Sequence, residues 1–112
     1  MDGSLAEAAI VVLTNLPDRA SAGKLARELI EGRLAACVNV GATVESIYHW
    51  RGEIETAAEV PLAIKTRAVL FSEVEAVIRR FHPYELPEIV AVPITHGSPA
   101  YLDWIAAETR SA

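Results

Sequence analysis

Residues 35–66, AACVNVGATVESIYHWRGEIETAAEVPLAIKT, decide the fold of this chain. The stretch is rich in β-branched and aromatic residues, and Arg51 and Gly52 near its middle are typical of a tight turn between two antiparallel strands. Gly41 interrupts the first strand, and we expect a bulge or bend there. The stretch therefore predicts a hairpin of two long strands, the second of which covers 53–66.

This hairpin is longer than one small domain needs. Each flank is more than twice as long as a typical strand of about 5–6 residues. The part that extends beyond the domain carries Ile47, Tyr48, Trp50 and Ile54, and exposed apolar patches with unpaired strand edges mark association surfaces. We therefore predict that a neighbouring subunit packs on this arm. The alternative is that the bend near Gly41 folds the arm back over its own sheet.

The segments around the hairpin complete the fold. The hairpin is preceded by a strand and an amphipathic helix. The strand is continuously apolar, which is typical of a central strand buried on both faces. The hairpin is followed by a second amphipathic helix, a fourth strand and a last helix. Their predicted ranges are a strand at 8–13, a helix that starts at Asp18 or Ser21 and ends at Gly32, a helix opened by a capping box at Ser72 and Glu75 and closed before Pro83, a strand at 88–95 with Pro93 at an edge or bulge, and a helix after Ser98. The order is β-α-β-β-α-β with an extra C-terminal helix, which predicts an α+β fold of the ferredoxin-like type.

Length and composition predict one domain. The chain has 112 residues, enough for one hydrophobic core, so we expect a single domain over 1–112 with 1–7 as a flexible tail. Its 52% hydrophobic content is too high for a disordered chain. Ten basic and fifteen acidic residues give a net charge of −5. The basic residues are scattered, so nucleic acid is not an expected partner.

The chain carries a single cysteine, Cys37, so an intrachain disulfide is excluded and a reducing compartment fits best. Residues 1–9 lack the basic residues that begin a signal peptide, and no apolar run approaches the roughly 20 residues that span a bilayer. We therefore expect a cytoplasmic protein with no membrane partner.

The sequence HPYELPE at 82–88 concentrates polar chemistry in a short loop. It combines an imidazole, a phenol and two carboxylates with two prolines that stiffen the chain, which makes the loop a candidate polar pocket. His49, His82 and His96 are the three histidines, and none has a partner at a motif-like spacing. The alternative is that the prolines only fix the loop, Tyr84 fills a gap and the charges are solvated.

Isolated residues elsewhere have two interpretations each. Cys37 lies in an apolar strand, where a thiol most often packs as a small hydrophobe. Lys65 falls between apolar neighbours, so we expect its ammonium to pair with a carboxylate such as Glu59, to lie at an interface or to bind an anion. An ordinary lysine on an edge strand is equally plausible. Trp50 and Trp104 are more typical of core or interface anchors than of ligand-stacking surfaces.

Familiar catalytic motifs are missing from the sequence. It contains no nucleophile elbow, P-loop, dinucleotide fingerprint, HExxH pair or EF-hand loop. This argues weakly against an enzyme, because a site assembled across subunits needs no linear motif. We expect a protein that is not a catalyst.

Five blocks of sequence carry a family resemblance. They are RLAACVNV at 33–40, SIYHWRGEI at 46–54, LAIKT at 62–66, HPYELPEI at 82–89 and GSPAYLDWI at 97–105. Together, over about 10–105, they closely resemble the CutA divalent-cation-tolerance family. The resemblance implies a ferredoxin-like subunit, a tight homotrimer built by long strands of adjacent subunits, and a cytosolic role in tolerance of copper and other divalent cations. It also implies an architecture similar to that of the trimeric PII signalling proteins.

The resemblance also implies a ligand pocket near a subunit boundary, formed by Cys37, Trp50, Lys65, Tyr84 and Trp104. It implies His82 and Glu88 as ligands of copper(II) or another divalent cation, since nitrogen and oxygen ligands suit copper or zinc. Some members carry a thiol where this chain has Thr14 and a second histidine where it has Phe81. A copper site here is therefore short of soft ligands, and its affinity is expected to be modest.

Three functions compete at this point. The first is a metal-binding or metal-responsive trimer, which the family blocks and His82 with Glu88 favour. The second is a PII-like sensor or adaptor scaffold that holds a small anion at Lys65 and presents loops to an unknown protein partner. The third, an enzyme with an intersubunit pocket, has the least support.

Overall fold

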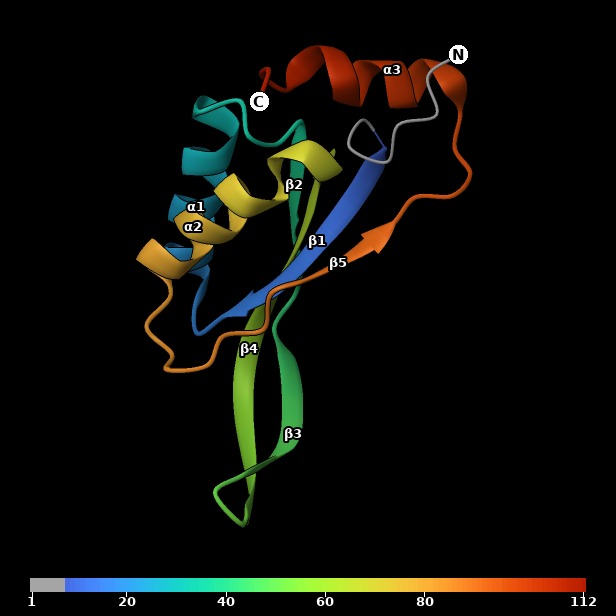
Figure 1. Cartoon of the computed structure of the whole chain (residues 1–112). Coiled ribbons are helices and arrows are strands. Elements are labelled where there is room, and N and C mark those ends of the chain that lie inside the picture. Colours follow the sequence, from blue (N-terminus) through green and yellow to red (C-terminus); the bar gives the residue numbers. More distant parts are fainter. Residues whose placement is uncertain (1–7) are drawn as a thin grey trace.

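The computed structural model describes residues 8–112, which form a five-stranded sheet, three helices and a projecting hairpin (Figure 1). The predicted tail at 1–7 lies outside the described residues. The elements in chain order are β1 (Ala9–Leu16), α1 (Arg19–Glu31), β2 (Cys37–Val40), β3 (Val44–Trp50), β4 (Glu53–Arg67), the short 3-10 helix η2 (Ala68–Leu70), α2 (Phe71–Phe81), β5 (Val90–Pro93) and α3 (Pro99–Glu108). This order confirms the predicted ferredoxin-like pattern with its long hairpin and extra C-terminal helix.

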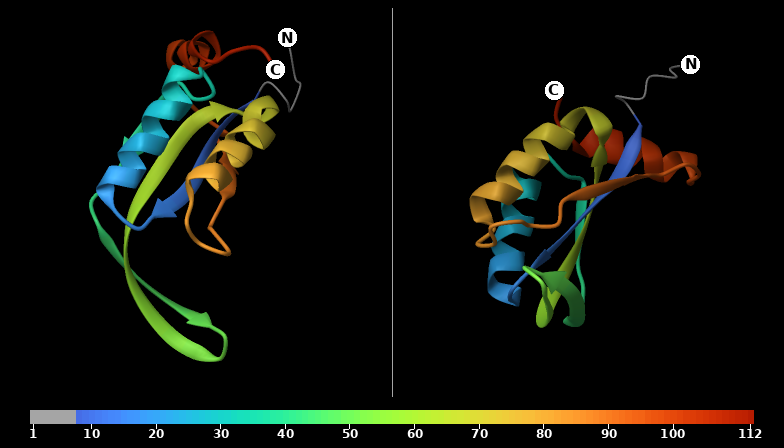
Figure 2. Two further views of the ribbon diagram at one scale, coloured as in Figure 1. Left: turned by 90° about the vertical axis from the view of Figure 1, so that its left-hand side faces the viewer. Right: turned by 60° about the horizontal axis from the view of Figure 1, so that its bottom comes forward.

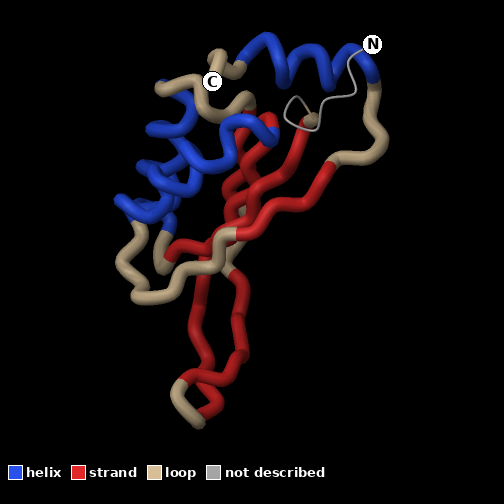
Figure 3. The backbone as a smooth tube through the Cα atoms, viewed as in Figure 1, coloured by secondary structure: helices blue, strands red, loops and turns tan. Residues whose placement is uncertain are grey.

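The sheet has the strand order β2-β4-β1-β5, and all its pairs are antiparallel. Because β5 pairs only with β1 among the described residues, Pro93 lies on an edge strand, as predicted. β4 is the longest strand and serves two parts of the molecule. Its second half pairs with β1 and β2, and its first half pairs with β3 beyond the sheet, so the strands continue from the sheet into the arm (Figure 3).

Helices α1 and α2 lie together on one face of the sheet (Figure 1). Their apolar sides follow the helical period and bury Leu25 and Leu29 from α1 and Val74 and Ile78 from α2, each with no exposed surface. The facing residues of the sheet are every second residue of β1 and β4, with Val12 and Ile64 paired at the centre. This layer is the hydrophobic core.

The opposite face of the sheet is less well covered. In β1 fully buried residues alternate with half-buried ones, so the prediction of a strand buried on both faces is wrong for this protomer. The reason is that α3 lies across only one end of that face (Figure 1). There the ammonium of Lys65 lies 5.9 Å from the ring centre of Tyr101, and Ile105 of α3 is fully buried.

The hairpin of β3 and the first half of β4 forms an arm that reaches out of the domain and lengthens the molecule to 49 × 25 × 23 Å. Its turn is the predicted one: Arg51 and Gly52 both have positive φ, 51° and 84°, which matches the twist of a two-residue hairpin loop. The arm curves, so that its tip approaches the loop after α2 (Figure 2). There Arg51 Nη2 lies 2.7 Å from Glu85 Oε1. The bend at Gly41 thus turns the arm partly back, yet Ile47 and Ile54 remain 67% and 70% exposed.

Helix boundaries confirm one predicted cap and correct another. Asp18 caps α1 by accepting a hydrogen bond of 2.8 Å from the backbone of Ser21. The capping box at Ser72 and Glu75 is wrong, because α2 begins at Phe71, two residues earlier than an N-cap at Ser72 would start it, and the preceding Leu70 offers no side-chain cap. The chain enters α2 through η2 instead. Among the helices that the structure describes, none is both long and apolar enough to cross a bilayer.

Candidate functional site

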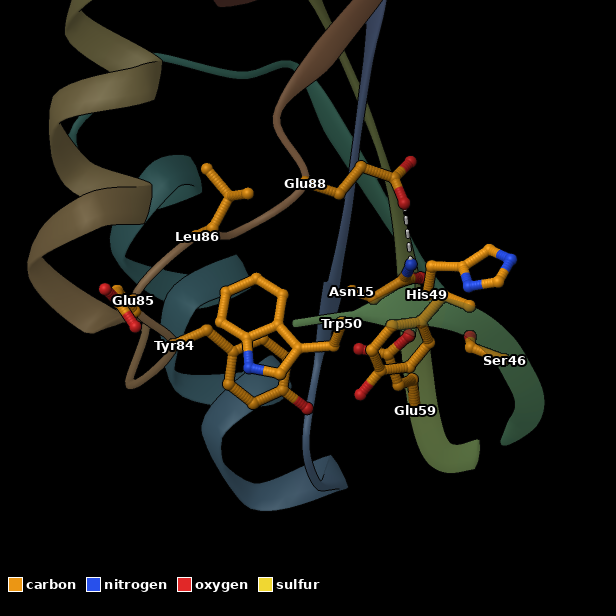
Figure 4. Close-up of a pocket in the computed structure, with 10 residues that line it drawn as sticks. Asn15, Ser46, His49, Trp50, Glu59, Tyr84, Glu85, Leu86 and Glu88 are labelled. Carbon is orange, nitrogen blue, oxygen red and sulfur yellow. Dashed lines mark hydrogen bonds between the residues drawn. The ribbon is translucent and has the colours of Figure 1, made fainter. Parts of the chain in front are cut away.

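A cavity of about 450 Å³ lies between the inner face of the arm and the loop that joins α2 to β5 (Figure 4). Its walls come from four places: Ser46, Tyr48, His49 and Trp50 of β3, Glu59 of β4, Asn15 at the end of β1, and Tyr84, Glu85, Leu86 and Glu88 of the loop. The cavity has the size of a small-molecule site. It is therefore the candidate functional site of the protomer.

The period of the strands explains which arm residues reach this cavity. Val44 is opposite Glu59, Tyr48 opposite Glu55 and Trp50 opposite Glu53, so Tyr48, Trp50 and Glu59 share one face of the arm. Ile47, His49 and Ile54 are on the other face, and of these only His49 also lines the cavity. The arm therefore has an inner face with aromatic and acidic side chains and an outer face on which Ile47 and Ile54 are exposed.

Glu59 is the buried charge of the site. The residue is only 8% exposed, and no cationic side chain among residues 8–112 forms an ion pair with it. Tyr84 lies beside it on the cavity wall and interacts with its negative charge. Burial of a carboxylate beside an uncharged residue is unfavourable unless a cation compensates it.

Burial of the ring raises the pKa of Tyr84, and the negative charge of Glu59 and the hydrogen bond to it raise that pKa further. We expect the phenol absorbance of the three tyrosines to titrate in steps, with the last step above the ordinary value of about 10. Tyr84→Phe should remove that last step, and Glu59→Gln should move it to lower pH. Because the raised pKa favours the protonated phenol in the folded protein, its contribution to stability is present below about pH 10 and is lost as pH rises through the folded value. A titration unaltered in Glu59→Gln would contradict the contact.

His82, a predicted metal ligand, is held on both sides of its ring. Its Nε2 lies 2.5 Å from the backbone oxygen of Asn15, and its Nδ1 accepts a hydrogen bond of 3.3 Å from the backbone N–H of Tyr84. This pair of contacts fits a neutral imidazole with its proton on Nε2. The residue is 9% exposed, and its ring lies 4.6 Å from that of Tyr84. His82 thus fastens the start of the loop to the end of β1.

Glu88, the other predicted metal ligand, lies on the cavity wall, where its carboxylate accepts a hydrogen bond of 2.9 Å from the side-chain amide of Asn15 (Figure 4). Within residues 8–112, no three His, Cys, Asp or Glu side chains are grouped so that they could hold a metal ion. With both nitrogens of His82 engaged, the residues of one protomer as they stand do not fit a resident metal centre. The ligation by His82 and Glu88 stays a prediction.

The five residues predicted for the ligand pocket fall into two groups. Trp50 and Tyr84 line the cavity. Cys37, Lys65 and Trp104 do not; Cys37 is paired with Lys65 across β2 and β4, on the part of the sheet that α3 approaches. Trp104 is 41% exposed and stacks on Tyr101 at 5.5 Å. One protomer therefore does not unite the predicted pocket.

The sequence analysis missed several wall residues and misassigned one. Asn15, Tyr48 and Leu86 were not predicted as site residues. Glu59 was considered only as a partner for Lys65, but their separation of six positions corresponds to about 20 Å along a strand, and Glu59 interacts with Tyr84 instead. The signal that finds Glu59 is the hairpin register, which places it on the same face as Trp50.

The model of the CutA1 divalent ion tolerance protein family matches residues 10–108. The chain belongs to this family. Among solved structures, CutA1 from Oryza sativa has a TM-score of 0.91 at 38% identity, covering 97% of this chain and 100% of that one. The divalent cation tolerance protein CutA1 from Thermus thermophilus has a TM-score of 0.89 at 41% identity, covering 91% of this chain and 99% of that one. These likenesses confirm the predicted CutA fold.

Curated CutA relatives agree with this assignment. The chain is 42% identical over 99 residues to the divalent-cation tolerance protein CutA of Thermus thermophilus, covering 88% of this chain and 96% of the relative. It is 40% identical over 102 residues to the chloroplastic protein CutA of Arabidopsis thaliana, covering 91% of this chain. This chain spans only 56% of the Arabidopsis protein and 54% of the mouse CutA.

Proposed function

We propose that this CutA-family chain acts in tolerance of divalent cations such as copper(II), as a cytoplasmic homotrimer without catalytic activity. The names of its relatives support the tolerance role. The single observation that supports assembly is the arm, whose outer face leaves Ile47 and Ile54 exposed to solvent. A protein seldom exposes contiguous apolar surface unless something binds there.

The unpaired strand edges of β3 and β5 differ from each other, which favours a head-to-tail assembly. Among the described residues, β3 pairs only with β4, and β5 pairs only with β1, so each has one unpaired edge. Val90 and Val92 of β5 are each 48% exposed. An arm of one copy that packs on β5 of the next makes a head-to-tail contact, and such contacts form a ring when the rotation between copies closes. A ring agrees with the trimer that the family resemblance implies.

The charge of the cavity favours a cationic over an anionic role. Its ionisable wall residues include three glutamates, Glu59, Glu85 and Glu88, and one histidine. The PII-like alternative would place a small anion at Lys65, whose ammonium faces the ring of Tyr101 of α3 and does not line the cavity. We therefore place divalent-cation tolerance first, with the cation as what the protein responds to and not as a resident cofactor.

Growth and mass together test this function. A bacterial host that lacks its own CutA gene is grown in increasing copper(II) with the wild-type chain, with an empty vector and with an assembly-deficient arm variant. We expect the wild-type chain alone to raise the tolerated copper(II) concentration, and sedimentation to give the mass of three protomers. Equal growth of all three strains in copper(II) and in other divalent cations would overturn the tolerance role.

Replacement of His82 by glutamine separates a structural role from metal ligation. Because both ring nitrogens are hydrogen-bonded in a buried position, we expect urea denaturation to show a loss of about 1–3 kcal/mol in the free energy of unfolding. Copper(II) must displace the Asn15 carbonyl from Nε2 to bind there, so we expect calorimetry to find only binding weaker than micromolar. Tight copper(II) binding that is lost in both His82→Gln and Glu88→Gln would instead make these residues metal ligands.

A further inference from the structure

The cavity between the arm and the 82–88 loop combines a buried negative charge with aromatic walls. We propose that it binds a small organic cation with a primary ammonium group, such as an aliphatic diamine. This inference goes beyond the proposed role in metal tolerance and does not rest on it. It is drawn from Glu59, from three aromatic rings on the cavity wall and from the contacts that the guanidinium of Arg51 makes at the rim.

Glu59 supplies the first argument. This residue is more than nine-tenths buried on the cavity wall, and none of the described cationic side chains forms an ion pair with it. Burial of a carboxylate is unfavourable unless a positive charge or several hydrogen bonds compensate it. The missing partner of Glu59 is therefore a cation that enters the cavity from outside.

Aromatic rings supply the second argument. Tyr48, Trp50 and Tyr84 all line the cavity (Figure 4), and the faces of such rings attract ammonium and guanidinium groups. The rim already shows this chemistry, because the guanidinium of Arg51 lies 5.1 Å from the ring centre of Trp50 while it pairs with Glu85 at 2.7 Å. Arg51 compensates Glu85 only. Among the described residues no cationic side chain forms an ion pair with Glu59 or Glu88.

The same walls exclude other ligand classes. An anion would meet three carboxylates. An uncharged apolar molecule would leave Glu59 buried without a counter-charge, which is less favourable than solvation by water. A hard metal ion prefers several oxygen ligands in a close shell, whereas the described residues contain no such group and this cavity has aromatic walls. An alkylammonium satisfies both the carboxylate and the rings.

Trp50 is a reporter inside the site. The chain has two tryptophans, so Trp104→Phe leaves Trp50 as the only source of indole fluorescence. In this background the assembled protein is titrated with putrescine at constant ionic strength, and with butanediol as the uncharged analogue of the same length. We expect a saturable change in Trp50 fluorescence with putrescine and none with butanediol.

Two further variants locate the binding energy. Glu59→Gln removes the charge and keeps the shape, and we expect it to weaken putrescine binding at least about tenfold. Glu45→Gln is the matched control, because Glu45 is exposed on the same arm and does not line the cavity; its affinity should equal that of the parent. Should Glu59→Gln fail to fold, Tyr48→Leu tests the aromatic wall, and we expect it to weaken binding several-fold.

Three results would overturn the inference. They are the absence of saturable putrescine binding, equal binding of putrescine and butanediol, and equal effects of Glu59→Gln and Glu45→Gln. An arginine or lysine from a neighbouring copy that fills the cavity would give the first of these results. Copper(II) tolerance and sedimentation mass are measured separately, so failure here is distinguishable from failure of the proposed function.

Discussion

Replacement of Ile54 by aspartate is expected to convert the assembled protein into single protomers. Ile54 is 70% exposed on the outer face of the arm, one strand away from Ile47, which is 67% exposed. An aspartate buried there against a neighbouring subunit loses its hydration without gaining a partner, at a cost of at least about 2 kcal/mol per contact. Because 2 kcal/mol is roughly a thirtyfold change in affinity and a ring contains several such contacts, sedimentation at micromolar concentration should find protomers only.

The matched control is Ser72→Asp, which adds the same charge at an exposed position in the first turn of α2. A negative charge near a helix N-terminus is favourable, so this variant should keep the mass of the wild type. If Ile54→Asp also keeps the assembled mass, the outer face of the arm is not an interface. If the wild type itself sediments as single protomers, the trimer proposal fails together with its ring geometry.

The hairpin was the part of the fold that the sequence predicted best, because its signals are local. A period of two, a glycine at the bend and an Arg51-Gly52 turn each act within a few residues, and the structure confirms strands on both sides of that turn. The glycine marks the bend, but the contact of the curved arm with the loop after α2 has no local signal. It accompanies the ion pair of Arg51 with Glu85, which joins residues from two elements that only the folded chain brings together.

The predicted start of α2 failed for a similar reason. Ser72 and Glu75 have the pattern of a capping box, but the short helix η2 lies between β4 and α2. Leu70 in that turn is fully buried, and its packing starts the helix at Phe71. Tertiary burial therefore overrides a favourable capping sequence.

The candidate site was only partly predictable. Trp50 and Tyr84 meet in one cavity because the register of the arm and the anchoring of the loop by His82 bring them together. The grouping of Cys37, Lys65 and Trp104 with them came from family resemblance alone, and one protomer separates the two groups. A pocket that unites them requires a second copy, so its prediction depends on assembly and not on the chain by itself.

The largest expected effect on folding comes from Ile64. Its side chain is fully buried in β4, where its neighbours across the strands are Val12 of β1 and Val38 of β2. We expect Ile64→Ala to lower the free energy of unfolding by about 2–5 kcal/mol, because it removes apolar contacts and leaves a cavity. The smaller change Ile64→Val should cost about 0.5–1.5 kcal/mol.

Ile30→Ala is the matched control for this loss, since Ile30 on α1 is already 40% exposed; its change in free energy should stay within about 1 kcal/mol. Urea denaturation must be measured at one protomer concentration, because assembly adds stability that depends on concentration. The difference in free energy of unfolding between the two alanine variants is therefore the decisive quantity, because the contribution of assembly is common to both. Equal losses in Ile64→Ala and Ile30→Ala would mean that the layer between the sheet and its two helices is not the core that holds the protomer together.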